Sequence, residues 1–230
     1  MKRKFGPNGT SGSLLAVLVA GIVIASLAVI PAAAQAAPHV YKNGSIVPEG
    51  QKLPFISWGT LTYQATTFGV IECRHVFSGN LQNPVGGGPG EGELEGLSAY
   101  HCTSASCENA GKTEEVFPVG LDNPLVSSWE LHLLEQPVGT FKLRMGNKNA
   151  ESKRKIALKI ICSGIIEGEA HGELSPNVKN GSSIGASPSK VEFRGAESGE
   201  LESSVGNITT IGKTKLMGYE GQDLITVKNP

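Results

Sequence analysis

The chain is poor in several residue types on which common functional sites depend. Among its 230 residues it has two Asp, Asp122 and Asp223, two Trp, Trp58 and Trp129, and only 6% aromatic residues. The two isolated Asp leave no Asp-x-Asp-x-Asp-Gly calcium loop, and two Trp make an aromatic platform for sugars difficult to build. The formal net charge is −1, which argues against a protein whose whole surface is basic.

Residues 1–36 have the layout of a secretory signal peptide. A positive start at Lys2 to Lys4 precedes an apolar run from Leu14 to Ile30, and Ala34-Gln35-Ala36 forms a small-residue exit. We expect cleavage after Ala36 and a secreted, extracellular protein whose net charge is −4. The apolar run is at the lower length limit of a membrane span, so an uncleaved N-terminal membrane anchor is the alternative.

The rest of the chain predicts an all-β fold. Short runs of alternating apolar and polar residues are separated by Gly, Pro, Asn and Ser, and no segment shows an apolar helical period. We expect a single β-sandwich or flattened barrel of about ten strands at 57–230, after an N-terminal extension at 37–56. The segments Asn83–Gly90 and Ser175–Pro188 are expected to be loops because they are rich in Gly, Pro and Ser.

The expected strands are Trp58–Ala65, Gly69–Phe77, Gly96–Cys102, Glu114–Val119, Ser128–Leu134, Val138–Met145, Lys155–Glu167, Lys190–Arg194, Leu201–Thr210 and Gln222–Lys228.

Four Cys in an exported chain indicate two disulfides. Of the three connectivities, we favour Cys73–Cys162 with Cys102–Cys107. Cys73 and Cys162 lie within strand-like runs, whereas Cys102 and Cys107 bracket a short polar segment. Two His lie near these Cys, but no Cys-x2-Cys pair and no helix-spaced His pair is present, so we expect disulfides rather than zinc, and no cofactor.

One run of residues could carry chemistry. Glu167, Glu169, His171 and Glu173 share one face of a predicted strand and could supply an acid, a base or metal ligands. Same-face neighbours stand about 6.5 to 7 Å apart, so binding one ion would also need residues from another strand. A solvated outer face is the more ordinary interpretation, because Glu is mostly exposed in folded proteins.

Glu91, Glu93 and Glu95 repeat the same alternation beside the Gly-rich segment. Glycoside hydrolysis uses two carboxylates about 5 to 9 Å apart, so these residues raise the possibility of a polysaccharide hydrolase. The chain lacks the Glu-x-Asp-x-x-Glu pattern of lectin-like glucanases. The sequence therefore favours no catalytic set.

A basic segment suggests a partner. Between Lys142 and Lys159 the only acid is Glu151, and a solvated hairpin end is the commoner meaning of such a segment. It could also contact an anionic cell-wall polymer or phospholipid headgroups. Nucleic acid is not expected, because the chain after residue 36 is acidic and aromatic residues do not interleave the segment. The basic residues are Lys142, Arg144, Lys148, Lys153, Arg154, Lys155 and Lys159.

Four short stretches resemble a set of uncharacterised secreted proteins of high-GC Gram-positive soil bacteria. They are Ile71-Glu72-Cys73, Tyr100-His101-Cys102 with Cys107, Lys215 to Tyr219, and Leu224 to Lys228. The resemblance implies an exported β-rich protein with paired Cys and assigns no catalytic residue. Together with the composition, it favours an extracellular or cell-wall-associated binding or structural domain. A secreted polysaccharide hydrolase that uses Glu167, Glu169 or Glu173 with His171 is the alternative.

Overall fold

The computed structural model describes residues 37–67, 69–105, 114–118, 129–137, 139–146, 156–162, 166–204, 206–220 and 222–230. Ala37–Pro230 form one compact unit, and the expected signal segment lies outside the described residues. No helix in these ranges is long and apolar enough to cross a membrane.

The described residues form fifteen strands and one short 3-10 helix. They are β1 (His39–Lys42), β2 (Ser45–Ile46), β3 (Leu53–Ala65), β4 (Gly69–Gln82), β5 (Glu91–Thr103), β6 (Glu114–Pro118), β7 (Trp129–Gln136), β8 (Thr140–Met145), β9 (Ile156–Cys162), β10 (Ile166–Gly172), β11 (Asn177–Lys179), β12 (Ser189–Arg194), η1 (Gly195–Ser198), β13 (Glu200–Ser203), β14 (Ile208–Gly218) and β15 (Ile225–Lys228).

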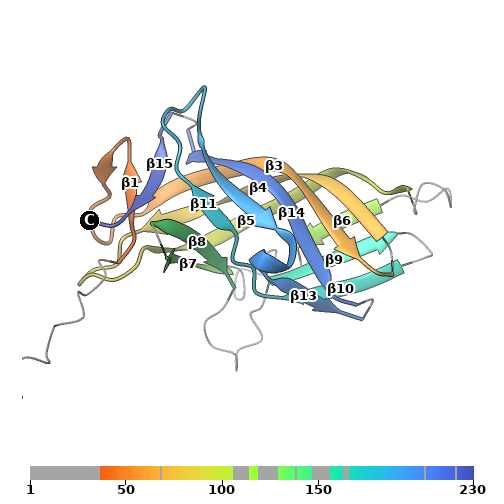
Figure 1. Ribbon diagram of the computed structural model, residues 1–230. Coiled ribbons are helices and arrows are strands. Elements are labelled where there is room, and N and C mark those ends of the chain that lie inside the picture. Colours follow the sequence, from red (N-terminus) through yellow and green to blue (C-terminus); the bar gives the residue numbers. More distant parts are fainter. Residues whose placement is uncertain are drawn as a thin grey trace, which may run out of the picture. The chain divides into compact units, whose positions relative to one another are not determined.

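Eight of the strands close into an antiparallel barrel (Figure 1). Their order is β12-β11-β8-β7-β5-β4-β3-β14, and β14 pairs back with β12 from Ser189↔Leu216 to Arg194↔Ile211. Closure lets backbone groups at both ends of this strand order hydrogen-bond within the molecule. The expected all-β fold is confirmed, and of the two expected architectures the structure is a barrel.

A second group of strands extends the sheet beyond the barrel. β14 pairs with β12 over Ile211–Leu216, and with β13 at Ile208 and Thr209. From β13 the sheet continues through β10 and β9 to β6, which lies beside β5. The long strands β3, β4, β5 and β14 are therefore part of both groups. The β7–β8 hairpin belongs to the barrel, and the β9–β10 hairpin belongs to the second group (Figure 1).

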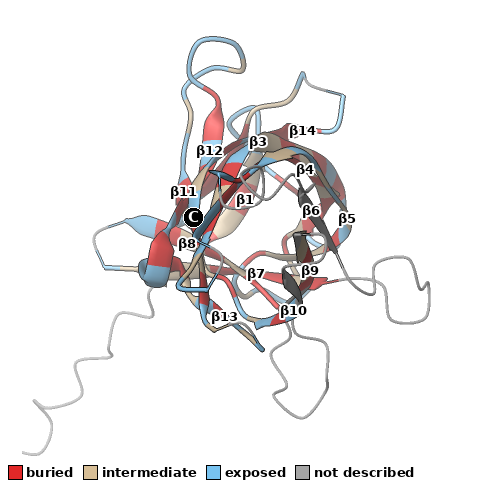
Figure 2. Ribbon diagram, turned by 90° about the vertical axis from the view of Figure 1, so that its right-hand side faces the viewer, coloured by how far each residue is buried: buried red, intermediate tan, exposed pale blue. Residues whose placement is uncertain are grey.

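The core lies inside the ring of strands. Alternate residues of a strand point to the same face, and on β3, β4 and β14 one set is largely buried (Figure 2). Burying each large apolar side chain contributes about 1.5 to 3 kcal/mol relative to leaving it exposed. Fully buried examples on adjacent strands are Leu61, Tyr63, Ile71, Leu81 and Leu94.

Residues 37–56 belong to this unit rather than forming a separate extension. β1 pairs with β15, and β3 already begins at Leu53. Asn83, which is fully buried, holds β1 in place: its side-chain carbonyl accepts from the Val40 N–H, and its amide donates to the Val40 and Val47 carbonyls. The anchoring of β1 by Asn83 was not predicted from the sequence, because Asn83 lies in a segment whose composition indicates only a loop.

Three predicted boundaries also differ from the structure. The expected strand Lys155–Glu167 is two strands, β9 and β10. Leu201–Thr210 contains the end of β13 and the start of β14, and the expected loop Ser175–Pro188 contains β11. β11 is short and flanked by Pro and Ser, so its own sequence carries little strand signal, and its pairing with β8 and β12 makes it a strand.

The predicted disulfide connectivity is wrong. Cys73 of β4 is bonded to Cys102 of β5, with their Cα atoms 4.1 Å apart. The two strands are direct neighbours, and a register shift between Glu72 and Arg74 occurs at this point in the ladder. This bond excludes both Cys73–Cys162 and Cys102–Cys107. Cys107 lies outside the described residues, and Cys162 is described only in its backbone, as the last residue of β9.

Candidate functional site

The predicted acid and imidazole run lies on an exposed strand face. Glu169 and His171 of β10 point outward with side chains 49% and 47% exposed, and Nε2 of His171 lies 3.5 Å from Oε2 of Glu169. Glu173 is also exposed, and the side chain of Glu167 lies outside the described residues. Ala170, between the two outward residues, is fully buried. This is the geometry of a solvated outer face.

Glu91, Glu93 and Glu95 lie on β5, and the first two line a shallow cavity of about 250 Å³ with Glu130 and His132 of β7. Their carboxylates already have partners. Gln82 donates to Glu91 at 3.0 Å, Lys52 lies 3.6 Å from Glu93, and Asn80 donates to Glu95 at 2.7 Å.

Within the described ranges no group of three or more His, Cys, Asp and Glu side chains could hold a metal ion. Among the described residues, the cavity therefore offers neighbouring carboxylates that have polar or basic partners.

The described residues of the predicted basic segment lie in two different groups of strands. Lys142 and Arg144 lie on β8, whereas Lys159 lies on β9 in the second group of strands. Lys148, Lys153, Arg154 and Lys155 lie outside the described residues. Lys142 instead joins basic residues that come from later in the chain.

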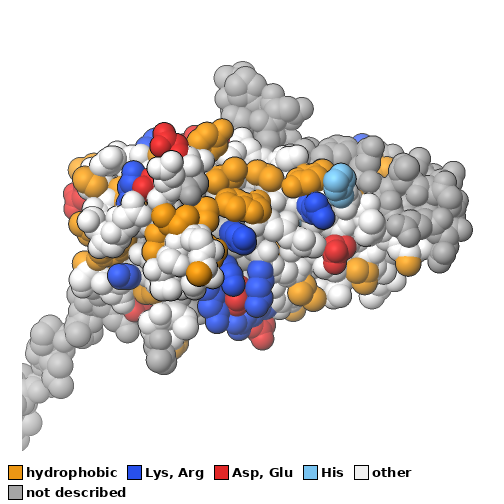
Figure 3. All heavy atoms as spheres, turned by 90° about the horizontal axis from the view of Figure 1, so that it is seen from above, with side chains coloured by type: hydrophobic (Ala, Val, Ile, Leu, Met, Phe, Trp, Pro, Cys, Tyr) orange, Lys and Arg blue, Asp and Glu red, His pale blue; other side chains and the backbone are white. Residues whose placement is uncertain are grey.

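Four neighbouring strands bring six cations to one outer surface, which we call the cationic face. Lys142 lies opposite Asn177 of β11, and Glu192 of β12 lies opposite both Asn177 and Lys213 of β14. Figure 3 shows Lys and Arg side chains gathered around an acidic one. The cationic face consists of Lys142, Lys179, Lys190, Arg194, Lys213 and Lys215, with Glu192 as the carboxylate among them.

Three lysines of this face lie in one row across the sheet. Lys190 is directly opposite both Lys179 and Lys215. Like charges directly opposite one another destabilise a sheet, by roughly 0.2 to 1 kcal/mol for a pair. Lys215 lies over the Trp58 ring at 5.9 Å, whereas Lys190 has no carboxylate partner among the described residues. Because repulsion along this row lowers the stability of the free protein, the row favours a function in which an anionic partner binds there.

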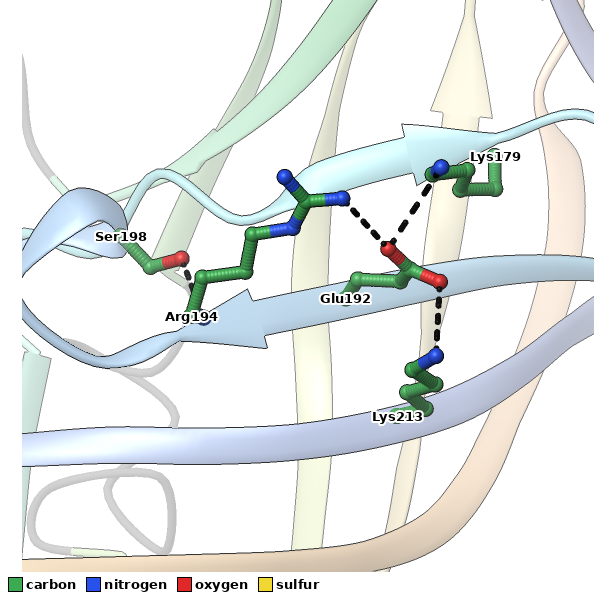
Figure 4. Close-up of polar contacts among 5 residues, drawn as sticks. All are labelled: Lys179, Glu192, Arg194, Ser198 and Lys213. Carbon is green, nitrogen blue, oxygen red and sulfur yellow. Dashed lines mark hydrogen bonds and ion pairs between the residues drawn. The ribbon is translucent and has the colours of Figure 1, made fainter.

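Glu192 organises the cations around it (Figure 4). Its Oε2 accepts from Arg194 at 3.1 Å and lies 3.9 Å from the Lys179 ammonium, and its Oε1 lies 3.2 Å from Lys213. Burial alone would raise the pKa of the Glu192 carboxyl. The hydrogen bonds from Arg194 and Lys213, together with the charge of Lys179, outweigh burial and hold that pKa below its ordinary value. Glu192 is therefore ionised at neutral pH.

A groove of about 620 Å³ opens beside this cluster, between the β7–β8 turn and β11. Lys142, Lys179 and Arg194 line it, and no carboxylate does so in the part of the chain that is described. Phe141 and Val178, both nearly buried, supply apolar surface. The groove therefore combines positively charged side chains with some apolar surface.

A polar cluster is buried inside the barrel. His75 is fully buried, its Nε2 is hydrogen-bonded to the Tyr63 hydroxyl at 3.1 Å, and its ring stacks on Phe77. Burial lowers the pKa of His75 to about 4 and raises that of Tyr63, so both are neutral at pH 7. The surrounding core excludes solvent, so we assign this cluster a structural role.

Sequence reasoning missed the cationic face, although a local signal was present. In Lys190-Val-Glu192-Phe-Arg194 and in Lys213-Thr-Lys215, charged residues alternate with buried ones, which places them on the outer face of a strand. The order of the strands around the barrel was needed to place them together. No protein-family model, no curated protein and no solved structure matches this chain.

Proposed function

We propose that this protein is a secreted binding protein that attaches to an anionic polymer of the cell wall through its cationic face. The observation that carries the proposal is the concentration of six cations around one carboxylate on four adjacent strands of an otherwise acidic chain. The row Lys179, Lys190 and Lys215 supports it, because a bound polyanion would offset the repulsion among these three lysines.

The arrangement suits an extended ligand better than a single ion. Neighbouring strands are about 4.8 Å apart, so the row presents positive charges at short, regular intervals. A polyanion that binds across it releases its condensed counterions, which makes the affinity fall steeply with salt. The exposed position of Glu169 and His171 gives no comparable support to a hydrolase.

The test is co-sedimentation of the exported protein with purified anionic wall polymer at 50 and 200 mM salt. We expect the double variant Lys190→Gln/Lys215→Gln to bind about tenfold more weakly at low salt, with a shallower salt dependence, because two ionic contacts are lost. Lys52→Gln/Arg74→Gln removes the same charge on the β4–β5 side of the sheet, outside the cationic face, and is the matched control.

Equal losses in the two double variants would show that only net charge matters and would overturn the proposal. Wild-type binding that is unchanged between the two salt concentrations would do the same. Stronger binding to nucleic acid than to wall polymer would replace the proposed partner.

A further inference from the structure

We propose that the groove between the β7–β8 turn and β11 binds the phosphate monoester of a phosphorylated sugar or polyol. The inference rests on the proposed function, because it names an anionic group that the same surface takes. The groove is a separate part of that surface, because Lys190 and Lys215 do not line it.

The charge at the groove matches a dianion. Lys142, Lys179 and Arg194 line it, and the carboxylate nearest to two of them is Glu192. Glu192 also pairs with Lys213, so the three groove cations keep an excess of at least two positive charges. A phosphate monoester carries close to two negative charges at neutral pH, whereas a sugar carboxylate carries one.

The cations are held in place before a ligand arrives. Lys179 and Arg194 both approach Oε2 of Glu192, so their charged groups lie close together at the rim. Lys142 donates to the backbone carbonyl of Glu197 at 3.0 Å. Arg194 keeps further N–H groups for a second acceptor, because its guanidinium has five donors. Glu192 is thus a positioning residue for the site.

The remaining lining suits the sugar or polyol that carries the phosphate. At about 620 Å³ the groove is far larger than a phosphate ion and lies within the usual range of ligand sites. Asn177 and Thr140 supply an amide and a hydroxyl for ligand hydroxyl groups, and Phe141 and Val178 offer apolar surface to the carbon skeleton. These groups would give a sugar phosphate contacts that inorganic phosphate cannot make.

The experiment is calorimetric titration of the exported protein with a hexose 6-phosphate, the corresponding hexuronate and the unmodified hexose. We expect saturable binding of the hexose phosphate, about tenfold weaker binding of the hexuronate, and none of the hexose. Arg194→Gln and Lys142→Gln should each weaken hexose phosphate binding about tenfold, as expected for loss of a hydrogen bond to a charged group. Arg74→Gln, on the outer face of β4, is the control and should change it less than twofold.

Lys142→Gln protects the test against misfolding, because the Lys142 ammonium is hydrogen-bonded to a backbone carbonyl, whereas Arg194 pairs with the Glu192 carboxylate. Equal affinity for hexose phosphate and hexuronate, or equal effects of Arg74→Gln and Arg194→Gln, would overturn the groove site. Wall-polymer binding without any response to hexose phosphate would overturn this inference alone.

Hexose phosphate binding without polymer binding would overturn the proposed function and leave the groove as a small-molecule site. Treatment of the polymer with phosphatase separates the two sources of the ligand. A loss of polymer affinity after treatment would support recognition of terminal phosphate on the polymer, and unchanged affinity would restrict the groove to free sugar phosphates.

Discussion

At position 75 a histidine occupies an interior site that the strand alternation assigns to an apolar residue. It is tolerated because the ring stacks on Phe77, one nitrogen is hydrogen-bonded to Tyr63, and the imidazole stays neutral. Nδ1 has no hydrogen-bond partner in the described part of the chain, so the site leaves one polar atom unsatisfied. Protonation would place an unpaired charge in the core.

We therefore expect the free energy of unfolding to depend on pH through His75. Its pKa is about 4 in the folded protein and about 6.5 in the unfolded chain, so between these values the unfolded state binds more protons. Stability should fall by about 3 kcal/mol as the pH drops from 6.5 to 4, and this group should add little further loss below pH 4. Urea denaturation at a series of pH values measures it.

Carboxylates also contribute to acid sensitivity, so the informative quantity is the difference between variants. His75→Gln should lose much of the decrease between pH 6.5 and 4, whereas His171→Gln, which removes an exposed imidazole, should retain it. A His75→Gln protein with the wild-type pH dependence would contradict this account.

At the scale of the strand, Gly59 shows how closely β3 and β14 approach one another. Gly59 lies opposite His75 in the β3–β4 ladder and opposite Thr214 in the β3–β14 ladder. A Cβ at this position would lie 2.1 Å from the backbone carbonyl oxygen of Lys213. The clash is with backbone in the barrel wall, so relief would require the two strands to separate.

Gly59→Ala should therefore lower the free energy of unfolding by about 2 kcal/mol or more. Gly185→Ala is the control, because a Cβ there has open space around it, and it should change stability by less than about 0.5 kcal/mol. Urea denaturation followed by circular dichroism compares the two. A Gly59→Ala protein as stable as wild type would show that the strands can move apart at little cost.

At the scale of the whole molecule, charge is distributed unevenly over an acidic chain. The net charge after residue 36 is −4, yet six cations share one face and several carboxylates share the surface of β5 and β7. Such a distribution orients an approaching polyanion toward the cationic face and away from the acidic cavity. Net charge alone would have predicted weak interaction with polyanions.

The covalent framework of the molecule gives a further prediction. Because Cys73 is bonded to Cys102, a second disulfide can only join Cys107 and Cys162. Glu114 pairs with Cys162 in the β6–β9 ladder, and Cys107 is seven residues before Glu114, a length of chain that can span about 25 Å. Peptide mapping without reduction should recover both bonds. A free thiol at Cys107 or Cys162 would contradict the second one.

Sequence alone determined the local features of this protein. The alternation in Gly69–Phe77 predicted a strand, and Asn83–Gly90 was predicted as a loop. These predictions succeed because side-chain alternation and turn chemistry depend on neighbouring residues. Among the described residues, helix is limited to the 3-10 turn Gly195–Ser198 and to Ala105, in agreement with the all-β prediction.

Only the tertiary structure decided which strands are neighbours, and with it the disulfide and the candidate site. Cys73 is bonded to Cys102 because β4 and β5 are adjacent strands. Lys142, Lys179 and Arg194 line one groove because β8, β11 and β12 are consecutive neighbours in the sheet. Strand pairing joins segments far apart in the chain through uniform backbone hydrogen bonds, so each strand's own sequence says little about its partner. The site depends on those pairings, and for that reason the sequence did not reveal it.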